Sequence, residues 1–560
     1  MNSKFFFNTS KLSNIKNSEI FKFSSISFII SLLDLLSITL ISLIFIKNIF
    51  TKNLENNLKL FSNIISFDSN YVIVFLILII FLKCILLIYL NKKIFEFSNE
   101  KQHNLRLKLF KLFSTLDFLK FLQSSPSLYI SLIGNHIKVL GSFISMTIQY
   151  IGDLFFLFLI ICLLFYVNYK FTFFLLILFI FTFFCLSKLK FLDSEKIGMD
   201  TKIAYKNLYA FVNNFFQSFK EVRTYNKIST INVNLKKYSS QLTTSDIKNN
   251  LVNLFPRLFL ELIATIIICL FFLFLLNFKS TIIIFENETE LLSILLASVL
   301  RLLPFFTSSL RYMVNMRYSY TFINELNENI QYLQKFQEKK KNIVNLKNQK
   351  ISIISFKNIF YNYDDKIVLQ NVSIDLKIGQ FIGIKGESGS GKSTLLNIIC
   401  GLLANERLEI FINNKRVPND QSITNLFAYV PQDKFLFEGE VWRNISLEND
   451  KKSCNFKKID EVIKKVKLKC NKNYLLYNSG NNLSGGQKQR LVIARALYFS
   501  KKIIIFDEST NELDNIAENE ILNVFKKQKD IIVILVSHKE KTLSYCDKKF
   551  ELRNNKLFLI

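Results

Sequence analysis

Long apolar runs constrain the first 310 residues of this chain more than any other feature. One of them reads IVFLILIIFLKCILLIYL at residues 73–90. The others lie at about 26–46, 139–167, 171–187, 254–276 and 291–313. A helix needs about 20 apolar residues to cross the hydrocarbon core of a bilayer. The runs therefore predict about six membrane spans.

The charges between these runs predict how the spans are oriented. Lys and Arg are concentrated before the first run and in two long segments, 92–136 and 188–250, whereas FENETE at 285–290 is acidic. Basic segments stay on the cytoplasmic side of a membrane. We therefore expect the N-terminus and both long segments to be cytoplasmic. Because the segments contain few helix breakers, they are predicted to extend the spans beyond the bilayer as helices.

The positive charge of the chain allows two interpretations. Lys and Arg total 72 against 44 acidic residues, which gives a formal net charge of +28. A nucleic-acid-binding protein has such an excess, but so does a membrane protein with basic cytoplasmic faces. The apolar runs count against the first interpretation, so no nucleic-acid partner is expected. The eight cysteines include no CxxC pair and indicate neither a disulfide framework nor a zinc site.

Glycine is scarce, with 14 in 560 residues, yet three glycines fall within the short stretch KGESGSGKST at 385–394. The spacing Gly386-x₄-Gly391-Lys392-Ser393, between a β-type run and a helical one, matches a phosphate-binding loop. Backbone N–H groups converge on phosphate oxygens in such a loop, and a Cβ would hold the backbone away. Lys392 can reach the β and γ oxygens, and the Ser393 hydroxyl can bind Mg²⁺. The predicted nucleotide-binding residues of the loop are Gly386, Glu387, Ser388, Gly389, Ser390, Gly391, Lys392, Ser393 and Thr394.

Later stretches narrow the prediction from nucleotide binding to hydrolysis. IIIFD reads as a buried strand that ends at Asp507, where a carboxylate can hold a magnesium ion. Glu508 follows directly and can polarise the attacking water. His538, in LVSHK, follows another apolar strand, where a structural histidine is the plainer alternative. Gln432, in YVPQDKFLF, lies between the phosphate loop and the stretch LSGGQ.

The order GESGSGKST, VPQ, LSGGQ, IIIFDE and VSH resembles that of ATP-binding-cassette ATPases, over residues 351–560. Six spans ahead of one cassette resemble an exporter-type half-transporter. The resemblance implies a multi-domain fold: an all-α six-helix transmembrane domain at 1–320, a linker at 321–350, and an α/β P-loop ATPase domain with an α-helical subdomain at 351–560. It also implies a multi-pass protein of the bacterial inner membrane whose cassette is cytoplasmic.

The resemblance further implies how the site is shared and which residues serve it. Two half-transporters, most simply a homodimer, would place their cassettes head to tail. The LSGGQ residues of one subunit would then close over the γ-phosphate held by Lys392 of the other. These residues are Ser484, Gly485, Gly486 and Gln487. Ser393, Gln432 and Asp507 would bind Mg²⁺, and Gln432, Glu508 and His538 would serve ATP hydrolysis.

An aromatic residue that stacks on the nucleotide base is also implied by the resemblance, about 25 positions before the loop. Tyr363 fits this role, with Tyr361 as a weaker candidate and a plain strand aromatic as the alternative. The chain departs from the family pattern at Asn478 in LYNSG, where Glu is common, and in NELD at 511–514. No departure removes a phosphate-contacting group, so hydrolysis is expected.

The function predicted from these features is ATP-driven export. An ATP-gated regulatory membrane protein and a DNA-acting ATPase fit the apolar runs and the intact hydrolytic residues less well. The sequence around the phosphate loop resembles flippases of lipid-linked oligosaccharides, so a polyprenyl-pyrophosphate glycan or glycolipid is the predicted cargo, with membrane lipids around it. A general lipid, drug or peptide exporter is the alternative.

Charged residues within the apolar runs predict where an anionic cargo would bind. A Lys or Arg at the centre of a span costs about 2.5–3.5 kcal/mol on insertion scales. Lys83, Arg257 and Arg301 are therefore predicted to line a cavity for an anionic headgroup, with Asp34 balancing their charge. Two plainer alternatives stand beside this prediction: Arg257 pairs with Glu261, four residues away, and Lys83 reaches toward the cytoplasmic surface.

Overall fold

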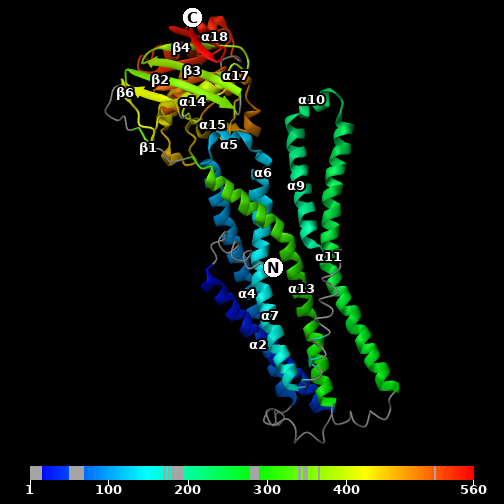
Figure 1. The fold of residues 1–560 in the computed structure, drawn as a ribbon. Helices are drawn as coiled ribbons and strands as arrows, with labels where there is room; N and C mark the ends of the chain where they lie inside the picture. Colours follow the sequence, from blue (N-terminus) through cyan, green and yellow to red (C-terminus); the bar gives the residue numbers. More distant parts are fainter. Residues whose placement is uncertain are drawn as a thin grey trace. The chain divides into compact units, whose positions relative to one another are not determined.

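The computed structural model divides the chain into two compact units, Met1–Gln337 and Glu338–Ile560. The first is built from long helices and the second from strands and helices (Figure 1). The structure describes residues 16–49, 69–167, 169, 172–173, 177, 193–277, 289–338, 342–344, 351–363, 366–405, 407–509 and 513–560.

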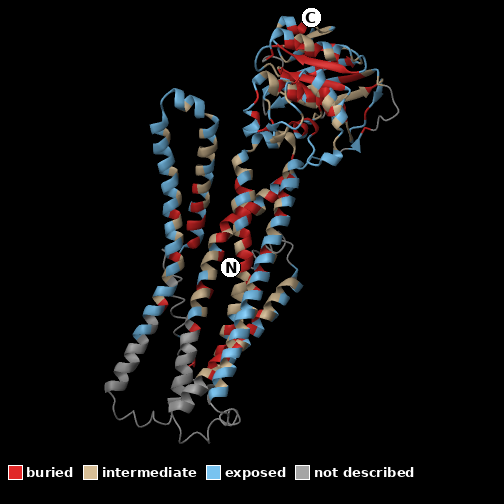
Figure 2. Cartoon of the chain, turned by 180° about the vertical axis from the view of Figure 1, so that it is seen from behind, coloured by how far each residue is buried: buried red, intermediate tan, exposed pale blue. Residues whose placement is uncertain are grey.

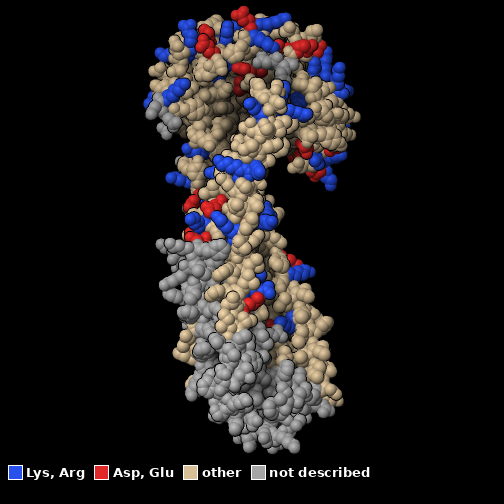
Figure 3. All heavy atoms as spheres, turned by 90° about the vertical axis from the view of Figure 1, so that its right-hand side faces the viewer, with Lys and Arg blue, Asp and Glu red and all other residues tan. Residues whose placement is uncertain are grey.

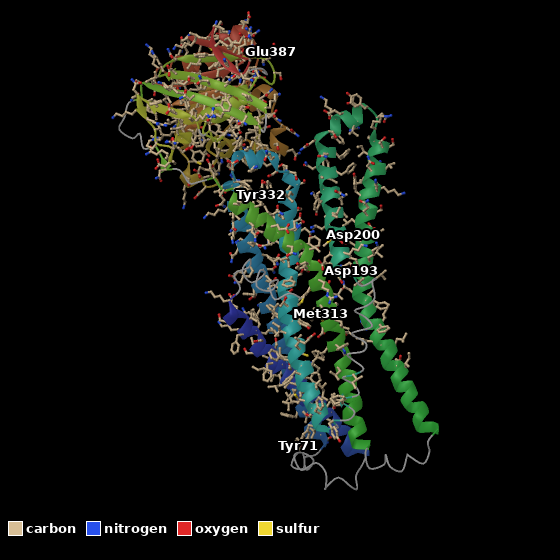
Figure 4. The ribbon with its side chains drawn as sticks, in the orientation of Figure 1. Tyr71, Asp193, Asp200, Met313, Tyr332 and Glu387 are labelled. Carbon is tan, nitrogen blue, oxygen red and sulfur yellow. The ribbon has the colours of Figure 1, made fainter. Side chains whose placement is uncertain are left out.

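The first unit is helical throughout its described part. Its long helices are α2 (Asn17–Ile49), α4 (Ser69–Ser114), α7 (Ile137–Val167), α9 (Ser194–Gln217), α11 (Ile228–Asn277) and α13 (Thr289–Lys335). Its short elements are α5 (Phe118–Gln123), α6 (Pro126–Ser131), the π-helical turn η1 (Leu132–His136) and α10 (Phe219–Thr224). Helix α10 joins α9 and α11 into a hairpin (Figure 1). Asp193, labelled in Figure 4, caps α9 by accepting a hydrogen bond from the backbone N–H of Lys196.

Within the described residues, three segments are long and apolar enough to cross a membrane: Ser18–Ile41, Asn70–Ser114 and Pro126–Tyr166. Apolar side chains such as Ile77, Phe81 and Ile88 of α4 are exposed in the single chain, which a lipid environment explains. Figure 2 shows how much of the long helices is exposed. Most of the predicted span at 171–187 lies outside the described residues, so the total of six stays a prediction.

Two helices are much longer than a bilayer is thick. Helix α4 has 46 residues and α11 has 50. At about 1.5 Å per residue they measure roughly 70–75 Å, against about 30 Å of hydrocarbon. The prediction that the basic segments extend the spans as helices is confirmed where α4 continues to Ser114 and where α11 begins at Ile228.

Helix α13 extends into the stretch that was predicted as a linker, 321–350. Residues 321–335 belong to α13, which continues unbroken to Lys335. The physical reason is burial: Phe322, Leu326 and Leu333 are at most 1% exposed and pack within the helical unit. Close packing also requires Gly198 of α9, because a Cβ there would lie 2.6 Å from the carbonyl oxygen of Tyr318 in α13.

The second unit is built around a six-stranded sheet with the order β14-β13-β4-β12-β11-β8. All neighbours in this sheet are parallel except the antiparallel pair β13 and β14. The strands are β4 (Phe381–Lys385), β8 (Phe427–Val430), β11 (Ile503–Asp507), β12 (Ile532–Val536), β13 (Lys548–Arg553) and β14 (Lys556–Leu559). Every residue of β11 and β12 is buried, as expected for central parallel strands covered on both faces.

Smaller sheets and helices complete this unit. A four-stranded antiparallel sheet joins β3 (Lys366–Lys377), β2 (Ile353–Tyr363), β5 (Glu409–Ile412) and β6 (Lys415–Arg416). Two-stranded pairs join β1 (Asn342–Ile343) to β7 (Gln421–Ser422), and β9 (Gly439–Glu440) to β10 (Leu475–Leu476). The helices are α14 (Lys392–Ile399), α15 (Val441–Ser446), α16 (Phe456–Lys465), α17 (Gly485–Phe499), α18 (Asn515–Lys526) and α19 (Glu540–Leu543). Helices α15, α16 and α17 pack together, with Trp442 fully buried in the core they share with the sheet.

Asparagine occupies many of the positions with a positive φ, where glycine is the more usual residue. Among the described residues, thirteen that are not glycine have a positive φ, and eight of these are asparagine. They are Asn226, Asn358, Asn371, Asn413, Asn414, Asn478, Asn554 and Asn555. Asparagine tolerates the left-handed region because its short side chain hydrogen-bonds locally. Some of the few glycines, such as Gly198 and Gly386, instead lie where a Cβ would meet backbone atoms.

Two of the three basic residues predicted to line a cavity have acidic partners. The ammonium of Lys83 lies 2.5 Å from Oδ1 of Asp34, whose side chain is only 2% exposed. The guanidinium of Arg257 lies 2.8 Å from Glu261, and both are exposed in the single chain. The side chain of Arg301 lies outside the described residues. Figure 3 shows few charges among the described atoms of the helices, and many on the second unit.

Loss of Lys83 alone is expected to destabilise the helical unit. In Lys83→Met, the buried Asp34 carboxylate loses its ion pair with Lys83, which lowers the free energy of unfolding by about 3–5 kcal/mol. The double variant Asp34→Leu/Lys83→Met removes both charges and regains most of that loss. Thermal unfolding of the detergent-solubilised protein measures the difference.

The exposed pair provides the control for this comparison. Arg257→Met breaks an ion pair whose two side chains are both exposed in the single chain, so the unfolding temperature is expected to stay near that of the unaltered protein. Equal stability of Lys83→Met and Arg257→Met would show that the pair with Asp34 is not structural.

Candidate functional site

The carboxyl ends of four neighbouring parallel strands lie at one edge of the six-stranded sheet. Strands β4, β12, β11 and β8 are adjacent in that order. The phosphate loop follows β4, His538 follows β12, Glu508 follows β11 and Gln432 follows β8. Because the strands are parallel, these residues share one edge, where ligands bind in open α/β sheets. The topology thus gathers groups that lie more than 150 positions apart in the sequence.

The phosphate loop has the glycines that its own packing requires. Gly391 has φ +101° and is the N-cap of α14, and a Cβ there would lie 2.7 Å from Cγ1 of Val368. A Cβ on Gly386 would lie 2.8 Å from the carbonyl oxygen of Leu552. Gly389 has φ +78° with no atom near its missing Cβ. The glycines are therefore needed for the loop to form, as well as for the approach of a phosphate.

Lys392 is folded back over the loop. Its ammonium donates hydrogen bonds to the carbonyl oxygens of Gly386 at 2.8 Å and Glu387 at 2.9 Å, and its side chain is only 7% exposed. Glu387 itself is exposed and is labelled in Figure 4. The hydroxyl of Ser390 is buried without a hydrogen-bond partner among the described residues. A buried, unpaired hydroxyl is costly, and a phosphate oxygen would supply its missing acceptor.

Asp507 ends β11 in a buried position, 8% exposed. Its Oδ2 accepts a hydrogen bond from the hydroxyl of Tyr429 at 2.5 Å. Burial raises the pKa of Asp507, although the bond from Tyr429 and the charge of Lys392 oppose that shift. Burial and the bond to Asp507 also raise the pKa of Tyr429, which keeps its hydroxyl protonated as the donor. The sequence analysis missed Tyr429, although it lies in the quoted stretch YVPQ, at the end of a β-type run.

Glu508 has the backbone geometry of a strained residue. Its φ is +50°, a region that residues other than glycine rarely adopt, and its N–H donates to the carbonyl oxygen of Val536 at 3.1 Å. Its Oε1 lies 3.2 Å from Nε2 of His538 and 3.9 Å from the ammonium of Lys392. Such strain persists where surrounding structure enforces it, and it concentrates at functional sites. The structure thus joins three of the predicted residues in one cluster.

Other predicted residues of this unit take no part in that cluster. Gln432 is exposed, two residues beyond β8, and no hydrogen bond of its side chain is described. Ser393 is exposed in the first turn of α14, whereas Thr394 beside it is buried. Tyr363 ends β2 in the antiparallel sheet, with its ring 5.1 Å from that of Tyr361. Ser388 is exposed in the phosphate loop.

The LSGGQ stretch forms the start of a helix. Ser484 is the N-cap of α17: its hydroxyl accepts from the N–H of Gln487 at 3.3 Å, and its own N–H donates to the Gln487 side chain at 2.9 Å. Gly485 and Gly486 form the first turn. A Cβ on Gly486 would meet only Leu513, at 3.9 Å. Nothing described in this chain explains a glycine at that position.

Comparison with known proteins agrees with this geometry. Residues 369–511 match the family model for the ABC transporter. This part of the chain is therefore similar to the ABC transporters. It lies in an α/β domain that follows a domain of apolar helices.

Two bacterial relatives illustrate the sequence similarity. The chain is 36% identical over 217 residues to a putative export ATP-binding/permease protein of Rickettsia prowazekii, covering 36% of this chain and 37% of that protein. It is 36% identical over 214 residues to the microcin-J25 export ATP-binding/permease protein of Escherichia coli, covering 36% and 37%. The chain thus matches little more than a third of the length of these relatives.

A third relative and a solved structure extend the comparison. The chain is 31% identical over 261 residues to the lactococcin-G-processing and transport ATP-binding protein of Lactococcus lactis, covering 44% of this chain and 37% of that protein. A bacterial Atm1-family ABC exporter with ATP bound has a TM-score of 0.75 and 17% identity, and the match covers 95% of this chain and 94% of that one. At this identity the match shows a shared fold.

Glu508→Gln is expected to keep nucleotide binding and to slow ATP hydrolysis by about 10²–10⁴-fold, the usual scale for losing a general base. The amide keeps the size of the carboxylate and its contact with His538, but it cannot accept a proton from water. Phosphate release by the purified protein, beside binding of a fluorescent ATP analogue, measures both effects. Turnover near that of the unaltered protein would remove Glu508 from the catalytic role.

Proposed function

We propose that this half-transporter binds ATP at the strand edge, hydrolyses it with Glu508 as the base, and uses the energy for export. The observation that carries the proposal is the strained Glu508, held between His538 at 3.2 Å and Lys392 at 3.9 Å. A carboxylate fixed beside the phosphate loop is placed to orient water toward a γ-phosphate. A regulatory protein gated by ATP needs only to bind the nucleotide. That alternative does not explain why Glu508 is held beside the phosphate loop.

Magnesium belongs to the proposed site because the donors fit it. Ser393, Gln432 and Asp507 offer oxygen ligands, which Mg²⁺ prefers. Among the described residues, no group of three or more His, Cys, Asp or Glu side chains could hold a metal ion by itself. Mg²⁺ is commonly held by one or two protein ligands together with substrate phosphates and waters. The ion would neutralise charge that develops on the phosphates.

We further propose that 1–320 is the membrane domain, reached through a linker that ends at 350, and that 351–560 is the cytoplasmic cassette. The bacterial inner membrane follows from the basic segments and the bacterial relatives named for export. The linker then begins as the last part of α13, because 321–335 is helical and packs within the first unit.

Two copies of the half-transporter would complete the site. Ser484 and Gly486 lie at a helix start with room for an incoming group, and a helix N-terminus attracts phosphate. Their partner in the proposal is the nucleotide on the phosphate loop of a second copy. Tyr363 would stack on the base in the same complex, at the end of β2.

A mixture of two inactive variants tests this sharing. Ser484→Arg and Lys392→Ala homodimers are each expected to lose most ATPase activity. In their heterodimer, one composite site carries both lesions and the other carries neither, so activity returns to about half that of the unaltered dimer. Gly486→Ala is the companion variant: its folding stability is unchanged, because the added Cβ has room, whereas its turnover falls. Full activity of the Ser484→Arg homodimer would contradict a shared site.

For the cargo, we propose an amphiphilic peptide rather than a lipid-linked glycan. Two relatives carry names that refer to microcin and lactococcin export. The predicted anionic-headgroup cavity needs free cations, but Lys83 is neutralised by Asp34 and Arg257 by Glu261. The polyprenyl-pyrophosphate glycan predicted from the phosphate-loop region is the second candidate, and it would depend most on Arg301.

Transport in proteoliposomes separates the two cargoes. We expect a labelled amphiphilic peptide to accumulate in an ATP-dependent way, and a polyprenyl-pyrophosphate glycolipid to stay in its leaflet. Glu508→Gln provides the inactive control. Movement of the glycolipid that is lost in Arg257→Met and Arg301→Met, with basal ATP hydrolysis retained, would reverse the assignment in favour of the lipid-linked cargo.

A further inference from the structure

The bond between Tyr429 and Asp507 joins two segments that are 78 positions apart in the chain. Strands β8 and β11 are parallel neighbours, with Tyr429 opposite Ile505 and Val430 opposite Phe506. This register places the tyrosine ring beside the end of β11, where its hydroxyl reaches Oδ2 of Asp507 at 2.5 Å. Hydrogen bonds from a hydroxyl to a carboxylate measure about 2.5–2.7 Å and are about twice as strong as neutral ones.

We propose that Tyr429 is a positioning residue for the magnesium ion: its hydroxyl holds one oxygen of Asp507 and leaves the other, Oδ1, for the hydration shell of the ion. This proposal rests on the proposed function, since it concerns the same site. The order of motifs in the sequence does not predict this role, because the tyrosine acts through Asp507 and contacts neither ion nor phosphate in the proposal.

A carboxylate in this position needs such a restraint. Asp507 is 8% exposed, so water does little to fix its orientation. Lys392 and Glu508 act on it electrostatically with opposite signs. The Tyr429 bond sets which oxygen faces the protein and which is free. Groups that orient a metal ligand in this way typically change metal affinity by about 10–100-fold when they are removed.

A purely structural role for Tyr429 makes a different prediction. If the hydroxyl only satisfies a buried carboxylate, its loss lowers folding stability and leaves the affinity for the metal unchanged. If it positions Asp507, its loss weakens metal binding, whereas binding of metal-free nucleotide is unchanged. Metal binding, measured apart from turnover, therefore distinguishes the two roles.

The experiment uses Mn²⁺ as the probe in place of Mg²⁺. Purified full-length protein in detergent is given a non-hydrolysable ATP analogue, and bound Mn²⁺ is measured by electron paramagnetic resonance. Tyr429→Phe is expected to raise the Mn²⁺ concentration for half-saturation by about 10–100-fold. Tyr498→Phe is the matched control, because it removes a hydroxyl that accepts a hydrogen bond from Asn455 away from the site.

A second comparison keeps the proposal testable if Tyr429→Phe folds poorly. Asp507→Asn and the double variant Asp507→Asn/Tyr429→Phe are measured with the same probe. Because the tyrosine acts through the carboxylate, its loss is expected to change Mn²⁺ binding by less than about 3-fold once Asp507 is replaced. A Tyr429→Phe protein that binds Mn²⁺ as tightly as the unaltered chain overturns the proposal, as does an equal loss in both backgrounds.

These outcomes are distinct from failure of the proposed function. If the unaltered protein binds no Mn²⁺ with the nucleotide analogue, the nucleotide site itself is wrong. If the unaltered protein binds Mn²⁺ and Tyr429→Phe binds it equally well, only the role of Tyr429 is wrong. Both results are read without any measurement of export or hydrolysis.

Discussion

The parallel pairing of β4, β12, β11 and β8 is the constraint on which the candidate site depends. Each strand is short, and β11 and β12 are buried along their whole length. Hydrophobic burial fixes their order and direction, and direction places every following loop at one edge. The phosphate loop and the residues that follow β11 and β12 can meet only because the strands run the same way. The chemistry of the site is thus a consequence of how apolar strands pack.

The strand packing is accompanied by backbone strain at Glu508, which has a positive φ. A left-handed backbone at a glutamate is unfavourable by about 1–3 kcal/mol. The N–H of Glu508 is bonded to the carbonyl oxygen of Val536 on the neighbouring strand, which holds the residue in place. The direction of its carboxylate toward His538 and Lys392 follows from that backbone. The chain accepts strain here while it assigns most other left-handed positions to asparagine or glycine.

The helical unit uses charge differently from the cassette. The Lys83 and Asp34 pair joins α2 to α4 in a region of apolar side chains, where either charge alone would be costly. Charged residues in spans were read from the sequence as cargo ligands. In the structure Lys83 forms an ion pair with Asp34 instead. This pair stabilises the contact between α2 and α4, and it explains Lys83 without a role in transport. The side chain of Arg301 lies outside the described residues, so its predicted contact with an anionic cargo stays a prediction.

The sequence by itself determined the two-part architecture, the long helical extensions of α4 and α11, and the glycine-rich loop that contains Lys392. These features depend on local composition and spacing, such as apolar run length and the positions of Gly386 and Gly391. Only the tertiary structure decided that Tyr429 holds Asp507, that Asp34 neutralises Lys83, and that α13 continues through 321–335. The first two contacts join residues 78 and 49 positions apart, and the third depends on burial against other helices. No local pattern encodes such pairings, because they arise from which surfaces the packed elements bring together.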